Sequence, residues 1–295
     1  MIKKDYPKIS IVTPSFNQGL FIEDTILSVL GQFYPNLEYF IYDACSTDNS
    51  IEIIKKYEKH LTYWVSEEDK GQADAINKGF QAATGDIFMW LNSDDVLMPN
   101  VLNFIAKKYV ENGEGIYFGN CIHFEEMSNG ITCKGSNVID NFNKIPLDLV
   151  DTIVQPSSFW TKEVWEKNGR LNTDFHFGFD WEWFLRAKKN NIKFISLNKP
   201  LSIYRFHNAH KTGVGGIKRQ KELAEIYSLY NSRYAKLYEL ISSEKYKLNK
   251  TQKLYFKLFN LFAKKKQSKA FFLKKFKKEY SDYSVDEIEY IKWML

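Results

Sequence analysis

The run Ile-Phe-Met-Trp-Leu-Asn-Ser-Asp-Asp at residues 87–95 joins five apolar residues to a polar turn that ends in two aspartates. Five consecutive apolar residues are too apolar for an exposed sheet edge, so the run predicts a strand at 87–91 that is buried on both faces. In an open sheet of parallel strands, ligands bind beyond the carboxyl ends of the strands. Asp94 and Asp95 are therefore expected at a binding edge.

The residues before this run alternate short apolar segments with helical apolar spacing. Strands are expected at 9–12, 39–42 and 63–65, and helices at 20–30, 50–59 and 73–83, with another helix after Pro99. Such alternation is typical of consecutive βα units. The sequence therefore predicts an α/β fold, with a Rossmann-like and mostly parallel sheet flanked by helices.

From residue 116 onward the pattern changes to strands and turns. Strands are expected at 116–119, 122–126, 131–134 and 157–161, a hairpin turn at Asn129-Gly130, and a helix at 181–189. Residues 217–295 then hold 19 Lys and Arg against 9 Asp and Glu, whereas residues 1–216 hold 22 against 27. We expect a main domain at 1–216 and a basic, aromatic, helical extension at 217–295.

The composition excludes several classes of protein. With 295 residues, 44% of them hydrophobic and 26% charged, the chain can bury a sizeable core. Its longest apolar runs are shorter than the roughly 18–20 residues of a membrane-spanning helix, and no signal peptide is visible. The three cysteines, Cys45, Cys121 and Cys133, are an odd number without metal-ligand spacing, which suits a reducing compartment. We expect a cytoplasmic protein of enzyme size.

Acidic residues follow three successive predicted strands. Asp43 follows the second strand, residues 67–69 (Glu-Glu-Asp) follow the third, and Asp94 and Asp95 follow the fourth. Like charges at one edge are costly unless a cation or hydrogen-bond donors compensate them. Oxygen ligands favour a hard divalent ion, Mg²⁺ or Mn²⁺. The alternative is that these are solvated loop acids.

These residues resemble the inverting family 2 glycosyltransferases of bacterial polysaccharide and glycolipid biosynthesis. The resemblance covers about residues 7–212 and rests on several motifs in a fixed order. They stand at 13–17 (Thr-Pro-Ser-Phe-Asn), 43–50, 69–80, 84–86, 91–95, 155–160, 180–186 and 204–207 (Tyr-Arg-Phe-His). The resemblance implies the GT-A fold over 1–216 and a hexosyltransferase-type enzyme.

By this resemblance, the nucleotide-binding residues come from the first four strand ends. Asp43 is expected to contact the nucleobase or ribose. The other residues implied are Thr13, Pro14, Ser15, Asn17, Lys70, Gln72, Asp74, Ser93 and Asp94. The sequence departs from the family pattern at Asn92, where an acid is common, and at Ala44-Cys45, where Gly or Ser is usual.

The same resemblance implies a metal site for Mn²⁺ or Mg²⁺. Asp94 and Asp95 stand for the DxD signature, with Asp95 the expected ligand and the other aspartate on the ribose or sugar. His207 is a third candidate ligand, although a lone histidine is more often structural. Arg205 and Lys211 are candidates to neutralise the phosphates, with surface solvation as the alternative.

Asp180 stands where the family has its catalytic base. The family often carries two acids there, and Phe179 replaces the first one. Asp180 could instead be a helix N-cap, and Glu182 is the alternative base. Gln155, Trp160 and Trp181 are expected to bind the acceptor, although core packing explains such aromatic residues equally well.

The extension at 217–295 interleaves apolar and basic residues at helical spacing. Such a helix can lie on an anionic membrane surface, or it can pack its apolar stripe on the main domain. No nucleic-acid reader motif is present.

The function that these observations predict is metal-dependent, inverting transfer of a sugar from a nucleotide-diphosphate donor, expected to be a UDP-sugar. The acceptor is expected to be a hydroxyl of a glycan or lipid-linked substrate in surface polysaccharide synthesis, used at the inner face of the cell membrane. A sugar nucleotidyltransferase would need an N-terminal Gly-rich phosphate loop, which the sequence lacks. A non-catalytic module that binds sugar nucleotides is the other alternative.

Overall fold

The computed structural model describes residues 6–127, 130–136, 138–207, 215–243, 247–262 and 267–295. The chain forms two compact units, one of residues 1–144 and 152–214, the other of residues 145–151 and 215–295. The predicted division after residue 216 assigned the segment 145–151 to the main domain, whereas the structure places it in the second unit. The two units are described separately.

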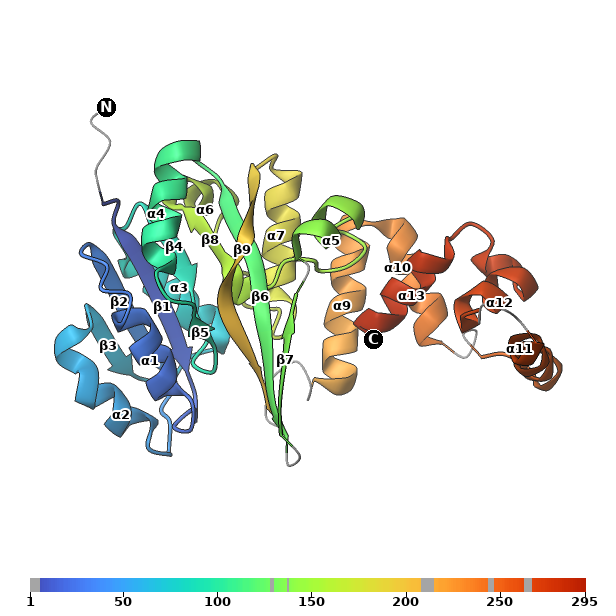
Figure 1. Cartoon of the computed structure of the whole chain (residues 1–295), viewed down its shortest axis with the longest axis horizontal. Coiled ribbons are helices and arrows are strands. Elements are labelled where there is room, and N and C mark those ends of the chain that lie inside the picture. The colour runs from blue at the N-terminus through green and yellow to red at the C-terminus, as the bar shows by residue number, and fades with distance from the viewer. Residues whose placement is uncertain (1–5, 128–129, 137, 208–214, 244–246, 263–266) are drawn as a thin grey trace. The chain divides into compact units, whose positions relative to one another are not determined.

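The first unit is built on one mixed sheet of nine strands (Figure 1). Its order is β3-β2-β1-β4-β8-β6-β9-β5, with β7 paired to β6. The strands are β1 Ile9–Ser15, β2 Leu37–Asp43, β3 Tyr63–Ser66, β4 Ile87–Trp90, β5 Val96–Leu97, β6 Ile116–Met127, β7 Gly130–Gly135, β8 Ser158–Thr161 and β9 Phe194–Phe206. The first four strands are parallel to their neighbours among them, as predicted.

Helices connect and cover these strands (Figure 1). In the first unit they are α1 Ile22–Leu30, α2 Ser50–Tyr57, α3 Gln72–Ala82, α4 Val101–Asn112, α5 Val138–Lys144, α6 Lys162–Asn168 and α7 Phe179–Lys189. The α/β fold, with its mostly parallel N-terminal half and flanking helices, is confirmed.

The core follows the two-residue period of the strands. Along β4, Ile87 and Met89 face a cluster that includes Ile26 of α1 and Ile105 of α4. The alternate residues Phe88 and Trp90 belong to a second, aromatic cluster. Its rings pack at centroid distances of 4.7–6.3 Å and belong to Phe80, Phe88, Trp90, Trp160, Trp165 and Trp183. Both faces of β4 are therefore covered, which explains why its sequence is continuously apolar.

Strand β9 is the largest element that the sequence did not predict. It pairs with β6 in parallel from Ile116↔Phe194 to Glu125↔Phe206. The register shifts between Gly119 and Cys121, opposite the segment 197–202, which contains Pro200. A proline next to a polar residue predicts a turn when only the local sequence is considered. A bulge accommodates this proline inside a strand. The two strands predicted at 116–119 and 122–126 are the single strand β6.

The second unit is helical, as predicted. Its helices are α9 Gly216–Tyr230, α10 Ser232–Ser242, α11 Lys250–Phe262, α12 Lys269–Phe276 and α13 Val285–Met294. The segment 145–151 joins this unit because Tyr227 donates a hydrogen bond to the Leu149 carbonyl at 2.8 Å and Asn231 donates to Asp148 at 2.6 Å. Over the described residues, no helix is both long and apolar enough to cross a membrane.

Candidate functional site

The ends of β1 and β2 are joined by a buried carboxylate. Asp43 is 1% exposed and accepts hydrogen bonds from the hydroxyls of Ser15 (3.0 Å), Ser46 (2.5 Å) and Ser66 (2.7 Å) and from the Ser46 amide (2.9 Å). Four donors fill the lone-pair positions of a carboxylate. Asp43 therefore fixes the ends of three strands, β1, β2 and β3, relative to one another, and in this arrangement no oxygen of its carboxylate is left for a base or ribose.

The loop after β1 is tied to the loop after β2. Asn17 has φ 52°, and its side-chain Oδ1 accepts a hydrogen bond from the Thr47 backbone amide at 2.8 Å. The backbone amide of Asn17 donates to Ser46 Oγ at 2.8 Å. Cys45 also has a left-handed backbone, with φ 55°. Gly adopts that conformation without steric cost, whereas the Cβ of Cys45 strains it. Thr13 and Pro14 are buried under these loops.

The loop before α3 reaches the turn after β4. Gln72 Nε2 donates to Asn92 Oδ1 at 2.7 Å. Asp74 accepts from the Lys70 amide at 3.1 Å, and Gly71 has φ +110° at the N-cap of α3. The Lys70 side chain is exposed. Gln72 therefore contacts the turn after β4, and Lys70 and Asp74 each stand two residues from Gln72 along the chain.

Asp95 faces into the protein. Its carboxylate, 1% exposed, accepts from Asn92 Nδ2 at 3.2 Å and from the Arg205 amide at 3.4 Å. The Asp95 carbonyl accepts from the Thr25 hydroxyl at 2.7 Å. Burial, together with the charge of Asp94, raises the pKa of the Asp95 carboxyl well above its ordinary value. Ser93 is also buried.

Asp94 lies beside His207. Its Oδ2 is 3.0 Å from His207 Nε2, and both side chains are partly exposed. The His207 ring also packs on Phe21 of α1, with centroids 4.4 Å apart. The two side chains are hydrogen-bonded to each other, and carboxylate and imidazole are both residue types that can bind Mn²⁺. In this structure Asp94 presents its carboxylate to the His207 imidazole, whereas Asp95 faces inward.

Arg205, whose amide contacts Asp95, is an ion-paired cation near this turn. Arg205 Nη2 is 2.8 Å from Asp24 Oδ2 of α1, and the guanidinium lies over the Phe21 ring at 5.1 Å. Lys211 lies outside the described residues. Within the described part of the chain, no three His, Cys, Asp or Glu side chains form a metal site. Any ion here would therefore take further ligands from substrate or water.

Asp180 lies in the first turn of α7, and the residue before it packs against β4. The ring centroids of Phe179 and Trp90 are 6.0 Å apart, and Trp90 ends β4 just before the turn at 92–95. The N-cap of α7 is Gly178, so the helix begins two residues earlier than predicted and Asp180 is not its N-cap. Asp180 Oδ1 accepts from the Trp181 amide at 2.8 Å.

The alternative base, Glu182, is unavailable for proton transfer. It is buried, and its two carboxylate oxygens receive Arg186 Nε at 3.1 Å and Nη2 at 2.9 Å. Arg186 also donates to the carbonyl of Asn168 at 2.7 Å and to that of Arg170 at 2.9 Å. A carboxylate held in such a bidentate pair is a structural clamp on the loop before α7.

The residues expected to bind the acceptor are core residues in this structure. Trp160 is 0% exposed and Trp181 2%, so neither offers a ring face to a sugar. Gln155 is buried and donates to the Trp90 carbonyl at 2.8 Å. Gln155 and Trp160 contact β4 in this structure, and acceptor binding by the three residues stays a prediction.

Sequence patterns did not point to Phe21 or Asp24 as site residues. The structure places the Phe21 ring against His207 and Arg205. Only the pairing of β9 with β6 and β5 brings residues 205–207 to α1.

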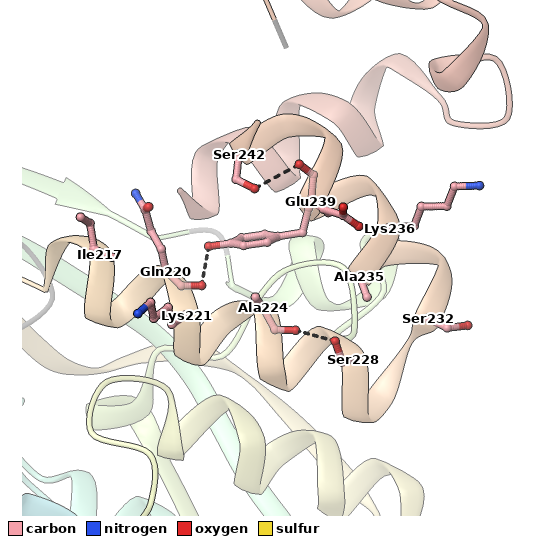
Figure 2. A pocket seen from close by; sticks show the side chains of 11 residues that line it. Ile217, Gln220, Lys221, Ala224, Ser228, Ser232, Ala235, Lys236, Glu239 and Ser242 are labelled. Carbon is pink, nitrogen blue, oxygen red and sulfur yellow. Dashed lines mark hydrogen bonds between the residues drawn. The ribbon is translucent and has the colours of Figure 1, made fainter. Parts of the chain in front are cut away.

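The second unit has a hollow of its own between α9 and α10, with a volume of about 580 Å³ (Figure 2). Its hydroxyls mostly serve helix geometry, since Ser228 donates to the Ala224 carbonyl at 2.9 Å and Ser242 to the Glu239 carbonyl at 3.2 Å. Glu239 is the one acid among its lining residues. This hollow therefore lacks the acid cluster of the first unit.

Comparison with known proteins identifies the family of the chain. The family model described as glycosyl transferase family 2 matches residues 10–161. A Bacillus subtilis glycosyltransferase named for teichuronic acid biosynthesis, TuaG, is 44% identical over 94 residues, which cover 30% of this chain and 36% of that protein. The GalNAc(5)-diNAcBac-PP-undecaprenol beta-1,3-glucosyltransferase of Campylobacter jejuni is 26% identical over 218 residues, or 72% of this chain and 69% of that protein.

Solved structures share the fold. The Pyrobaculum calidifontis mannosyltransferase PcManGT, in complex with GDP-Man and Mn²⁺, superposes with a TM-score of 0.62 at 16% identity, covering 98% of this chain and 86% of that one. Staphylococcus aureus TarS with UDP-GlcNAc gives 0.60 at 17% identity, covering 94% and 73%. At this identity the likeness is one of fold.

Proposed function

The chain belongs to glycosyl transferase family 2, and from that premise we propose that it transfers a sugar from a nucleotide-diphosphate donor to an acceptor hydroxyl with inversion. The observation that carries this proposal is the meeting of three sequence-distant parts at the end of β4. These are Asp94 in the turn, His207 after β9, and the first turn of α7 with Asp180, reached through the Phe179–Trp90 contact.

The donor is proposed to bind across the ends of β1, β2 and β4. The hydrogen bonds of Asp43 and Asn17 pre-form the loops at the base end, and the Gln72–Asn92 bond joins them to the acidic turn. Lys70 is exposed beside this turn and can neutralise phosphate charge. We propose a UDP-sugar; TarS was solved with UDP-GlcNAc, while PcManGT holds GDP-Man.

Asp94 and His207 are proposed to hold Mn²⁺ or Mg²⁺. Two cis ligands of an octahedral ion, each about 2.1 Å from it, lie about 3.0 Å apart. Asp94 Oδ2 and His207 Nε2 are 3.0 Å apart, so the pair fits such an ion. When bound, the metal would stabilise the negative charge of the diphosphate leaving group.

Asp180 is proposed to take the proton from the acceptor hydroxyl while the sugar carbon is displaced in one step. A single displacement with one base gives inversion, through an oxocarbenium-like state of the kind known from glycoside hydrolysis. The ion pair with Arg186 keeps Glu182 out of this role. Arg186 also fixes the loop that precedes α7, which holds Asp180 in position.

The acceptor is proposed to be a glycan or lipid-linked hydroxyl used at the inner face of the cell membrane. The Campylobacter relative is named for an undecaprenol-linked substrate, which supports a lipid-linked acceptor. The competing function is a module that binds sugar nucleotides without turnover, which would not require a base at 180.

A panel of UDP-, GDP- and dTDP-sugars, measured by thermal shift with and without Mn²⁺, tests the donor. We expect sugars of one nucleotide class to raise the melting temperature of the protein when Mn²⁺ is present. Without metal, the same sugars should raise it only slightly. Nuclear magnetic resonance of the transfer product then reports the anomer. Donor binding without any release of nucleoside diphosphate over a set of acceptors would favour the binding module.

A further inference from the structure

The most exposed apolar surface in the second unit lies on helix α11. Leu254, Leu258 and Leu261 are 58%, 49% and 73% exposed. With about 100° between successive residues, these three leucines fall within an arc of roughly 60°. They form one continuous stripe, called here the leucine stripe. Large apolar side chains aligned in this way mark an interaction surface more often than scattered ones do.

A second, aromatic face of α11 lies next to the leucine stripe and packs against α12. Tyr255, Phe256 and Phe259 pack around Phe272 of α12, with ring centroids 5.9, 5.1 and 5.5 Å from its ring. Phe272 itself is fully buried. The aromatic face therefore anchors α11 to its own unit and holds the helix so that the leucine stripe faces away from Phe272.

Lysines line one flank of the leucine stripe. Lys250, Lys253 and Lys257 recur at helical spacing and fall along one flank of the stripe. The whole stretch 247–278 holds twelve lysines and no aspartate or glutamate. Burial, together with the charges of Lys292, Lys253 and Lys277, lowers the pKa of Lys269. The lysines of this stretch are thus close enough to repel one another, and an anionic surface would relieve that repulsion.

We propose that α11 docks on an anionic lipid bilayer, with the leucine stripe in the headgroup–acyl boundary and Lys250, Lys253 and Lys257 on the lipid phosphates. A basic helix with one apolar face and short length suits a position in the membrane plane rather than across it. A protein partner would need an acidic groove as long as α11. An anionic bilayer, in contrast, offers negatively charged headgroups and an apolar interior next to each other. Lipid also suits a helix whose lysines extend past the stripe on only one flank.

Vesicle flotation with the full chain tests this inference. The vesicles are phosphatidylcholine alone, or equal parts of phosphatidylcholine and phosphatidylglycerol, at about 0.1 M and about 1 M salt, where the Debye length falls from about 10 Å to about 3 Å. The expected result is binding to the anionic vesicles at low salt, weakened at high salt, and little binding to neutral ones. Equal binding to both vesicle types, or none, overturns the proposal.

Matched double variants separate the two contributions. Lys253→Gln with Lys257→Gln should weaken binding about 30-fold, whereas Lys55→Gln with Lys59→Gln, exposed lysines at the same spacing in the first unit, should not. Leu254→Ser with Leu258→Ser should weaken it on the order of 100-fold, whereas Ile217→Ser with Leu229→Ser, at least as exposed on α9, should not. Unchanged melting temperatures show that each variant is folded.

The alternative that the test must distinguish from lipid binding is a second copy of the chain covering the leucine stripe. If light scattering shows a dimer that Leu254→Ser with Leu258→Ser converts to a monomer while vesicle binding is unchanged, the proposal is wrong. Vesicle binding requires neither donor nor metal. Its failure would therefore leave the proposed sugar transfer standing, and loss of transfer in Asp180→Asn would leave this inference standing.

Discussion

His207 Nε2, one residue after the end of β9, lies 3.0 Å from Asp94 Oδ2 in the turn after β4, although 113 residues separate them in the chain. The pairing depends on β9 running along β6 and reaching β5. Phe21, at the N-cap of α1, also packs on the imidazole. The pair is therefore positioned before any ion or donor binds, which lowers the entropic cost of assembling a metal site.

Replacing either member of this pair should remove the metal dependence of donor binding. For His207→Ala and Asp94→Asn we expect turnover to fall at least about 100-fold, because several kcal/mol of leaving-group stabilisation are lost. The measurement is the Mn²⁺-dependent rise in melting temperature with the donor present. His60→Ala, at an exposed histidine of the first unit, is the matched control. Retention of the Mn²⁺ response in His207→Ala would assign the histidine a structural role.

Asp180→Asn should separate binding from chemistry. The amide keeps the shape and can still accept from the Trp181 amide, but it cannot take a proton. We expect donor affinity to remain and the transfer rate to fall on the order of 10²- to 10⁴-fold. Asp174→Asn, at an exposed acid earlier in the same loop, should leave both unchanged. Loss of donor binding in Asp180→Asn would contradict the base assignment.

Gly71→Ala should weaken donor binding through the backbone. Gly71 has φ +110°, where an L side chain is strained, and an added Cβ would lie 3.5 Å from His176 Nδ1. We expect a loss of about 1–3 kcal/mol in stability and a weaker donor affinity, because Lys70 and Gln72 flank this position. Gly113→Ala is the control, since it has φ +74° with no atom within 4 Å. Both variants should melt earlier, but only Gly71→Ala should change the dissociation constant of the donor.

The ion pair between Glu287 and Arg233 should make the stability of the second unit depend on pH. The Arg233 guanidinium donates to both oxygens of Glu287 and lowers the pKa of that carboxyl from its ordinary 4.5 to about 2. A folded-state pKa below the unfolded value stabilises the protein above about pH 4.5, and this stabilisation is lost as the pH falls toward 2.

Glu287→Gln isolates that ion pair, because glutamine can still complete the capping box with Ser284. We expect a loss of about 1 kcal/mol at pH 7, limited by the exposure of Arg233, and a smaller difference from the native chain below pH 4.5. Melting temperatures between pH 3 and 7 measure it. Asp286→Asn, at an exposed neighbour on the same helix, should give a smaller difference. A difference that is constant over this range would show that the pair contributes nothing.

Much of the first unit could be predicted from local patterns. Four apolar runs and the helices between them predicted the parallel strands β1 to β4. A strand that is buried on both faces has a continuously apolar sequence, which is easy to recognise. The order of the motifs specified the family and placed acids at the ends of β2 and β4. These features depend on residues within a few positions of one another.

Burial and long-range pairing could not be predicted in the same way. Trp160 is a residue type that often stacks on sugars, but the rings of Trp90, Trp165 and Trp183 enclose it. The inward direction of the Asp95 carboxylate, toward Asn92 and the Arg205 amide, follows from no local pattern, and metal binding by Asp95 stays a prediction. Strand β9 was missed because Pro200 interrupts its pattern, and a bulge opposite Asn120 resolves the interruption.

The sequence by itself determined the α/β fold class, the family and the edge of the sheet at which acidic residues gather. Only the tertiary structure decided which of two adjacent aspartates faces a histidine, which tryptophans are covered, and which acid near Asp180 is clamped by an arginine. The physical reason is that strand period and loop chemistry are local properties of the chain. The direction of a carboxylate, in contrast, depends on partners that folding brings from more than a hundred residues away.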